Sequence, residues 1–518
     1  MTNAQGITET GADDQNGWRM PGVLILLVMA ADWLLYRNDG GGLGWAVLLG
    51  LVALAVFAPE ALSLNARALT KRGFLALAAL LPLLDNVSPL SLFVSLCLTA
   101  ILVLYHEGQA ARFGAALVRQ IAGFFLLAPF RLLFDLLFSL QRPRPTGRRQ
   151  RLLGHVLTWS ITALFGGVFV LLFATANPLI DRWLTQFDLG LLLNLFEPAR
   201  LAFWIVVAMG LYAFLRPYVL PPRNRPVREV SNAGDRTLLA AFFNRAALLR
   251  ALLVFNGLFA IQNGLDATYL WGGAALPDGM TYASYAHRGA YPLIATALLA
   301  GGFVLIAMRP GAALSRDHVI RSLVYVWTAQ NIWLVASSIL RLDLYVDAYA
   351  LTYWRVAAFV WMGLVGVGLA LILARIALEK SNGWLVTANL AALSAVLYCC
   401  CFINFAGRVA DFNVAHGREA GGVGLPVDLT YLADLGPQTI PALDRLIALR
   451  GPIDPACRAQ RAAPCAAELR DHLAAEVSQW RFDWRNWTVR NIRLMDYVAN
   501  TPSIPAPATV SKPGAGPE

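Results

Sequence analysis

Long apolar runs without charge constrain this chain more than any other feature of its sequence. An α-helix rises about 1.5 Å per residue, so about 20 apolar residues cross the hydrocarbon core of a bilayer. The pattern predicts eleven such spans, at residues 21–36, 43–59, 72–85, 88–105, 153–175, 200–215, 248–265, 291–308, 320–340, 355–377 and 385–405. We therefore expect an all-α, polytopic helical membrane protein.

The composition favours the same fold class. Of 518 residues, 58% are hydrophobic and only 14% are charged, whereas about a quarter of the residues in a soluble domain carry charge. This composition excludes a soluble enzyme and a nucleic-acid-binding module as descriptions of the whole chain. We expect membrane lipid as a partner and no nucleic acid.

Span 72–85 is the weakest of the eleven, because only Gly73–Leu84 is free of charge. Its short length favours a tight helical hairpin with span 88–105. Asp85 and Asn86 would then form the turn between the two helices.

Residues 116–141 are long enough to span, but Pro129, Arg131 and Asp135 interrupt their apolar run. If segment 121–141 crossed the membrane, the basic runs on its two sides would face opposite compartments. A helix lying flat in the interface keeps both runs on one side. We favour the flat helix, and a further span is the alternative.

The distribution of basic residues predicts the orientation. With the amino terminus inside, the inner segments hold 24 of the 42 Lys and Arg residues, the outer loops hold 6, and the tail after residue 405 holds 12. Cytoplasmic loops of membrane proteins carry the excess of positive charge. The sequence therefore predicts a multi-pass protein of the bacterial inner membrane with a cytoplasmic segment 1–20, a transmembrane domain 21–405 and an outer carboxyl-terminal region.

That outer region is predicted to be a small helical domain, residues 406–500, followed by a disordered tail, residues 501–518. Helical spacing of apolar residues recurs at 427–435, 441–449 and 466–480. Trp480, Trp484 and Trp487 follow at intervals of four and three, which predicts one stripe along a helix. The stripe would pack on the core of the domain or lie at the membrane interface, where Trp is enriched.

Two cysteines, Cys457 and Cys465, lie in this outer domain. An oxidising compartment permits a disulfide between them, which would close a short loop. Two free thiols are the alternative. No metal or cofactor site is expected, because His416 and Glu419 have no second His or Cys nearby.

Polar side chains gather at the predicted outer ends of the later spans. They form a candidate outer-face polar cluster of Asn263, Asp266, Asp278, Tyr282, Tyr285, Arg288, Arg341, Asp343, Tyr345, Tyr349, Thr352, Arg355 and Asn413. One interpretation is a cavity in which arginines hold a small anionic group. The other is structural: aspartates and arginines occur in nearly equal numbers and would neutralise one another at the helix ends.

Four stretches of the sequence resemble a known family. They are Leu276–Gly289, Arg341–Arg355, Asn404 with Asp411–Val414, and Leu429–Leu432 with Pro441–Leu443. The chain resembles bacterial membrane proteins called domain of unknown function 4173, related to group 4153. The resemblance implies a polytopic inner-membrane protein with an outer helical tail and no established reaction. It marks as signature positions Tyr282, Tyr285, Arg288, Arg341, Tyr345, Thr352, Arg355 and Asn413. Ala350 stands where this family has glycine.

Three function classes follow from these patterns. The first is transport, permeation or binding through the outer-face polar cluster. The second is a membrane sensor or scaffold that acts through its outer tail on an envelope protein. The third, which the absence of a recognisable catalytic set disfavours, is a membrane-embedded enzyme acting on a lipid-linked substrate.

Overall fold

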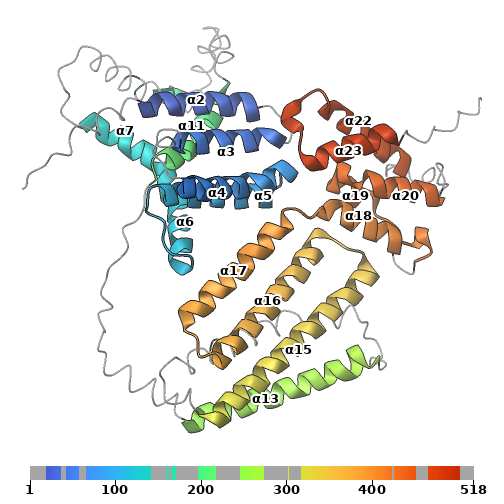
Figure 1. The fold of residues 1–518 in the computed structure, drawn as a ribbon. Coiled ribbons are helices and arrows are strands. Elements are labelled where there is room, and N and C mark those ends of the chain that lie inside the picture. The colour runs from blue at the N-terminus through green and yellow to red at the C-terminus, as the bar shows by residue number, and fades with distance from the viewer. Residues whose placement is uncertain are drawn as a thin grey trace, which may run out of the picture. The chain divides into compact units, whose positions relative to one another are not determined.

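The computed structural model describes residues 19–36, 42–57, 66–141, 197–217, 245–273, 317–422, 425–450 and 465–501, with isolated helical positions at 159–170 and 302. Within these ranges every regular element is a helix (Figure 1). The chain forms two compact units, Met1–Arg223 and Asn224–Glu518, and each is described by itself.

The first unit contains apolar helices that share one core. Its helices are α2 (Arg19–Leu35), α3 (Gly42–Phe57), α4 (Ala66–Asp85), α5 (Pro89–His106), α6 (Ala115–Leu127), η1 (Ala128–Phe130), α7 (Arg131–Gln141) and α11 (Pro198–Leu215). Leu34, Val52, Val103, Phe124 and Phe214 pack together in this core. In a bilayer such helices associate through van der Waals packing of their side chains, because lipid tails are as apolar as this core.

The predicted hairpin between α4 and α5 is confirmed. Helix α4 ends at Asp85, and α5 begins at Pro89 after a three-residue turn. Ser88 caps α5, because its hydroxyl accepts a hydrogen bond from Ser91 N at 3.2 Å, and Pro89 occupies the first helical position.

The segment predicted to lie flat forms two helices, α6 and α7, separated by the short turn η1 at Pro129. Helix α6 runs across the direction of α2–α5 (Figure 1). Ala115–Leu137 is nevertheless long and apolar enough to cross a membrane. The interfacial placement therefore stays a prediction.

The second unit begins with a layer of long apolar helices. These are α13 (Arg245–Asp266), which continues into the π-helical turn η2 (Ala267–Trp271), α15 (His318–Tyr349), α16 (Tyr353–Ala377) and α17 (Asn382–Cys400). A group of shorter helices follows: α18 (Phe405–His416), η4 (Arg418–Ala420), α19 (Leu429–Leu435), η5 (Pro437–Thr439), α20 (Ile440–Arg450), α22 (Ala466–Trp480), η6 (Trp484–Asn486) and α23 (Val489–Asn500).

Helices α13 and α15 are parallel. At their amino-terminal ends, Arg245 Nε donates to Asp317 Oδ2 at 2.6 Å. Further along, Asn263 Nδ2 donates to the carbonyl oxygen of Gln330 at 3.1 Å. Figure 1 shows both helices starting from the same end. Two helices that run in the same direction can both span a bilayer only if the chain between them crosses that bilayer an odd number of times.

Asp317 caps the start of α15. Its carboxylate accepts hydrogen bonds from Val319 N at 2.9 Å and Ile320 N at 3.3 Å, in addition to the one from Arg245. The hydrogen bond from Arg245, together with these backbone donors, holds the pKa of Asp317 below its usual range.

The helices after residue 405 have an apolar core of their own. Buried side chains of α18, α19, α20, α22 and α23 pack together, among them Val414, Leu432, Leu443, Leu473 and Leu494. The helical patterns predicted at 427–435, 441–449 and 466–480 correspond to α19, α20 and α22.

The predicted tryptophan stripe is wrong. Helix α22 ends at Trp480, and Trp484 begins the separate turn η6, capped by Asp483. Trp487 is extended and donates from Nε1 to the carbonyl oxygen of Trp480 at 3.2 Å. The side chain of Asp483 accepts a hydrogen bond from the backbone of the next turn, so the helix ends before Trp484. The helical spacing of the three tryptophans therefore does not continue.

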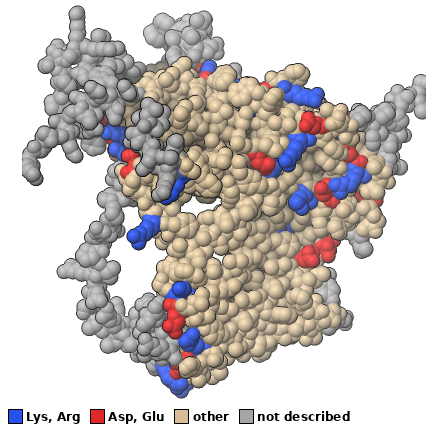
Figure 2. Space-filling view, viewed as in Figure 1, with Lys and Arg blue, Asp and Glu red and all other residues tan. Residues whose placement is uncertain are grey.

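Seven helices in the described part of the chain are long and apolar enough to cross a membrane, and α2 and α3 are shorter apolar helices. Nine of the eleven predicted spans coincide with a described helix; spans 153–175 and 291–308 lie outside the described residues except at isolated positions. In Figure 2 the charged residues of the second unit gather near the start of α13 and α15 and over α18–α23. On the face that Figure 2 shows, the surface of the helices between these two groups is almost entirely free of Lys, Arg, Asp and Glu. The number eleven and the outer placement of residues 406–500 stay predictions.

Candidate functional site

A buried ion pair joins α13 to α15. Asp266 is fully buried and Arg341 is 4% exposed, and Arg341 Nη2 donates to Asp266 Oδ1. Gln262 Nε2 donates to the same oxygen at 3.1 Å. A buried charge that loses its partner typically destabilises a fold by about 3–5 kcal/mol. An aspartate–arginine pair at a helix end is what the structural interpretation of the polar cluster predicts.

The backbone changes at the ion pair. Asp266 ends the regular part of α13, and the next five residues form the π-helical turn η2. Trp271, the last residue of that turn, donates from Nε1 to Ser337 Oγ on α15 at 3.1 Å. Single π-helical turns recur at functional sites because they re-aim side chains within a helix.

Between the ion pair and the amino-terminal ends of the two helices, α13 and α15 carry amide and indole side chains with buried polar atoms. We call Asn256, Asn263, Trp327, Gln330 and Asn331 the polar seam. The amide nitrogens are used within the helix pair: Asn256 Nδ2 donates to the carbonyl oxygens of Leu252 and Leu323 at 2.8 and 3.1 Å. Asn331 Nδ2 likewise donates to the carbonyl oxygen of Trp327 at 2.8 Å.

The opposite ends of the same side chains have no partner. Among the described residues, these buried atoms without a hydrogen bond are Asn256 Oδ1, Asn263 Oδ1, Gln330 Oε1, Asn331 Oδ1 and Trp327 Nε1. A buried polar atom left unpaired costs about 1–3 kcal/mol. Four of the five are oxygen acceptors, so the seam is chemically suited to a hydrogen-bond donor or a hard cation.

Among the described residues, the guanidinium of Arg355 contacts the carboxyl-terminal end of α15. Its Nη1 donates to the carbonyl oxygens of Tyr349, at 2.5 Å, and Ala350. The guanidinium carbon also lies 4.7 Å from the ring centroid of Tyr345, a cation–π contact. Thr352 caps α16 by accepting from Arg355 N at 3.4 Å. Arg355 therefore satisfies the carboxyl end of α15.

Asn413 connects the helices after residue 405 to the turn between α15 and α16. Its Oδ1 accepts from Leu351 N at 2.7 Å, and its Nδ2 donates to Leu351 O at 2.9 Å. Nearby, Tyr353 N donates to the hydroxyl of Tyr431 at 3.0 Å. Ala350, just before this contact, has φ 66° and ψ 169°, a region that glycine occupies easily and alanine does not.

The other predicted members of the cluster are Asp343 and four residues of one loop. Asp343 is exposed on α15 and forms no ion pair within the described residues. The loop that carries the other four predicted members, Asp278, Tyr282, Tyr285 and Arg288, lies outside the described residues.

The polar cluster predicted from the sequence does not include Gln262 or, apart from Asn263, any residue of the polar seam. Asn256 and Asn263 stand seven residues apart within an apolar run, a spacing that places both on one face of a helix. Gln330 and Asn331 likewise interrupt an otherwise apolar segment. Amides inside predicted spans were the signal that would have found them.

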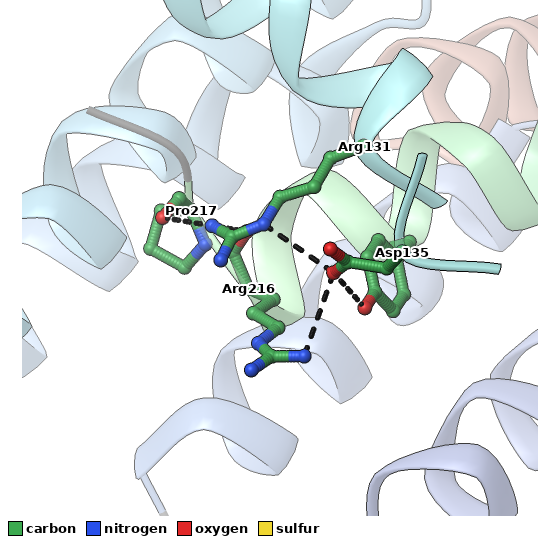
Figure 3. A network of polar contacts seen from close by, with 5 residues as sticks. Arg131, Asp135, Arg216 and Pro217 are labelled. Atoms are coloured by element: carbon green, nitrogen blue, oxygen red, sulfur yellow. Dashed lines mark hydrogen bonds and ion pairs between the residues drawn. The ribbon is translucent and has the colours of Figure 1, made fainter. Parts of the chain in front are cut away.

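In the first unit, Asp135 links α7 to the carboxyl end of α11 (Figure 3). Tyr212 donates its hydroxyl to Asp135 Oδ2 at 2.7 Å, and Arg131 Nε and Arg216 Nη1 each lie 3.4 Å from that oxygen. Arg131 Nη1 also donates to the carbonyl oxygen of Pro217 at 3.0 Å. These contacts make a structural anchor between two helices.

A second charged contact of the first unit lies at the other end of α11. Arg200 Nε and Trp204 Nε1 both donate to Asp32 Oδ1 on α2 at 2.8 Å. Tyr36 donates to Glu197 Oε2 at 2.9 Å. Because the end of α2 meets the start of α11, the two helices are antiparallel.

Cys465 is disulfide-bonded, whereas Cys97, Cys399, Cys400 and Cys401 are free thiols. The predicted partner, Cys457, lies outside the described residues. The pairing of Cys457 with Cys465 therefore stays a prediction.

Comparisons with known proteins identify a family. No curated protein and no solved structure matches the chain. Residues 72–446 match the family described as a domain of unknown function (DUF4153). The match covers most of the chain, including the ion pair and the polar seam, and the related group 4173 is not confirmed. The chain belongs to the DUF4153 family.

Proposed function

We propose that this chain is a multi-pass inner-membrane protein whose polar seam binds a small cation or hydrogen-bond donor and allows its passage. The observation that carries the proposal is the set of buried amide oxygens on α13 and α15 that have no hydrogen-bond partner. Polar groups inside a membrane are costly and usually serve function. The Asp266–Arg341 pair stands at one end of this seam.

The proposed topology has eleven spans, an inner amino terminus and an outer helical domain. Ion pairs within the second unit agree with it. Arg245 with Asp317, and Arg321 with Glu379, join residues predicted inside. Asp266 with Arg341 joins residues predicted outside.

Helix direction supports the same topology. The parallel pair α13 and α15 fits the predicted alternation, in which span 291–308 separates them. The antiparallel pair α2 and α11 fits it too, because four predicted spans separate the first span from the sixth, so these two run in opposite directions. This count of spans assumes that the helical segment 116–141 lies in the membrane interface and does not cross the membrane.

The function is tested by thermal stability of the full chain in nanodiscs. We expect sodium, potassium or ammonium, each compared with choline at equal ionic strength, to raise the melting temperature. Asn263→Leu and Asn331→Leu should abolish the shift, and Asp343→Asn should leave it unchanged. Flux of the stabilising ion in proteoliposomes then separates passage from binding. No shift with any of the three ions would overturn the proposal.

A second candidate function is a membrane scaffold that acts through the outer helical domain. The observation in its favour is the paired amide contact of Asn413 with Leu351, which fixes the domain to the end of α15. A photo-reactive residue in place of the exposed Leu449, used in native membranes, should then give one reproducible protein adduct. The buried Leu443 site should give none. Absence of an adduct at Leu449 would contradict the scaffold.

A further inference from the structure

The segment 481–493 of the second unit, between α22 and α23, exposes large apolar side chains. Phe482 is 91% exposed, the most of any large apolar side chain in the described part of the chain. Trp484, Trp487, Val489 and Ile492 are also exposed. Exposed large apolar side chains that gather within one short segment are typical of a protein or membrane interaction site. We call residues 481–493 the basic aromatic segment.

The same segment is strongly basic. It contains Arg481, Arg485, Arg490 and Arg493 and one acidic residue, Asp483. The Asp483 carboxylate pairs with Arg485 Nη2 at 2.7 Å, and the hydrogen bond from Arg485 lowers the pKa of Asp483. Arg481 and Arg493 are exposed and form no ion pair with the described residues. An excess of positive charge therefore surrounds the aromatic side chains.

One arginine of the segment contacts the end of a membrane-length helix. Arg490 Nη1 donates to the carbonyl oxygen of Ile403 at 3.3 Å, and Nη2 donates to that of Cys401 at 3.4 Å. Both carbonyls directly follow α17, which ends at Cys400. The basic aromatic segment is thus held beside the point where α17 would leave the hydrocarbon layer.

We infer that the basic aromatic segment binds the headgroups and upper acyl chains of anionic phospholipids at that membrane surface. Tryptophan is enriched at the membrane–water interface, because its ring is apolar and its N–H is polar. Arginines near an anionic surface are attracted to lipid phosphates. The excess positive charge favours anionic lipid over an apolar protein partner. This inference rests on the proposed membrane placement of α17.

Photo-crosslinking of the full chain tests the inference. Benzoylphenylalanine replaces Phe482, the exposed Trp361 of α16, or the exposed Leu449 of α20, one site at a time. Each protein is placed in nanodiscs of equimolar phosphatidylcholine and phosphatidylglycerol. We expect lipid adducts at 361 and 482 but not at 449. At 482, phosphatidylglycerol should be several-fold enriched over phosphatidylcholine, and Arg481→Gln with Arg493→Gln should remove the enrichment.

The control sites separate the two proposals. Adducts at 361 without adducts at 482 would overturn the lipid-binding inference and leave the membrane placement intact. An adduct at 482 to a protein, including a second copy of this chain, would also overturn it. Failure of lipid to react at 361 would instead contradict the membrane placement itself. Equal adducts with both lipids at 482 would contradict the role of the arginines.

Discussion

Asn413 and Leu351, 62 residues apart in the sequence, pair through two hydrogen bonds of 2.7 and 2.9 Å. The side-chain amide of Asn413 satisfies both backbone polar atoms of Leu351, in the turn between α15 and α16. That turn is thereby joined to the group of helices that follows α17. The signature position that the sequence singled out at 413 thus has a defined structural partner.

Replacing Asn413 tests this connection. Asn413→Ala leaves Leu351 N and O without their partner, so we expect the free energy of unfolding to fall by about 1–3 kcal/mol. Hydrogen exchange at residues 351–353 should accelerate. The exposed Asn500→Ala is the control and should change neither quantity. Unchanged exchange in Asn413→Ala would show that the pair does not hold the turn.

Ala350 predicts a stabilising substitution. Its φ of 66° with ψ of 169° strains any residue with a Cβ atom, so Ala350→Gly should raise stability by about 1 kcal/mol. Ala348→Gly, two residues earlier within α15, should instead lower stability by about 0.5–1 kcal/mol. Thermal unfolding of the two variants measures the opposite signs. A loss of stability in both would contradict the strain at Ala350.

The buried pair of Asp266 and Arg341 predicts strong coupling. Asp266→Leu and Arg341→Met should each destabilise the protein by about 3–5 kcal/mol, because each leaves one buried charge uncompensated. The double variant should lose much less than the sum of the two, which a double-mutant cycle measures. Asp343→Asn, at an exposed site, should have almost no effect. Additive losses would rule out a direct pair.

The pKa of Asp317 predicts a pH dependence. Because that pKa is lower in the folded than in the unfolded chain, the stabilisation by Asp317 is present above the unfolded value of about 3.9. It is lost as the pH falls through the lower, folded value. Asp317→Asn keeps the helix cap but removes the charge.

The melting temperature of the wild type should therefore exceed that of Asp317→Asn by a constant amount near neutral pH. The difference should shrink as the pH falls below about 4. Asp347→Asn, on an exposed site of α15 without an ion pair among the described residues, is the control. A difference that does not vary with pH would contradict a charged pair between Asp317 and Arg245.

The predicted disulfide is open to a direct chemical test. Alkylation of the denatured, unreduced chain should modify the four thiols Cys97, Cys399, Cys400 and Cys401. Two further thiols, those of Cys457 and Cys465, should react only after reduction. Cys457→Ser should expose Cys465 without reduction. Modification of all six cysteines before reduction would contradict the bond.

The spans were predictable because a bilayer requires a fixed length of apolar helix. The runs at 320–340 and 355–377 needed no tertiary information to be recognised, and they correspond to α15 and α16. The apolar runs alone could not predict which side chains of different helices would contact one another. Asp266 and Arg341 are 75 residues apart, and the sequence offers several other aspartates and arginines as partners. The parallel arrangement of α13 and α15 determines which two of them pair.

Spacing alone was also insufficient in the helices after residue 405. The intervals between Trp480, Trp484 and Trp487 fit a helix, but a local cap at Asp483 ends the helix before the stripe can form. The strained backbone at Ala350 was indicated in the sequence only weakly, by the glycine that the resembled family has at this position. Long-range contacts therefore determine which charged side chains pair, and local capping determines where a helix ends; the periodicity of apolar residues predicts neither.

A high-resolution map of the full chain in nanodiscs, prepared in the ion that most raises its melting temperature, addresses the polar seam itself. We expect ordered non-protein density within hydrogen-bonding or coordination distance of Asn263 Oδ1 and Asn331 Oδ1. This density should disappear in Asn331→Leu. Amide oxygens that are instead paired with donors from the protein, with no density between α13 and α15, would contradict a binding seam.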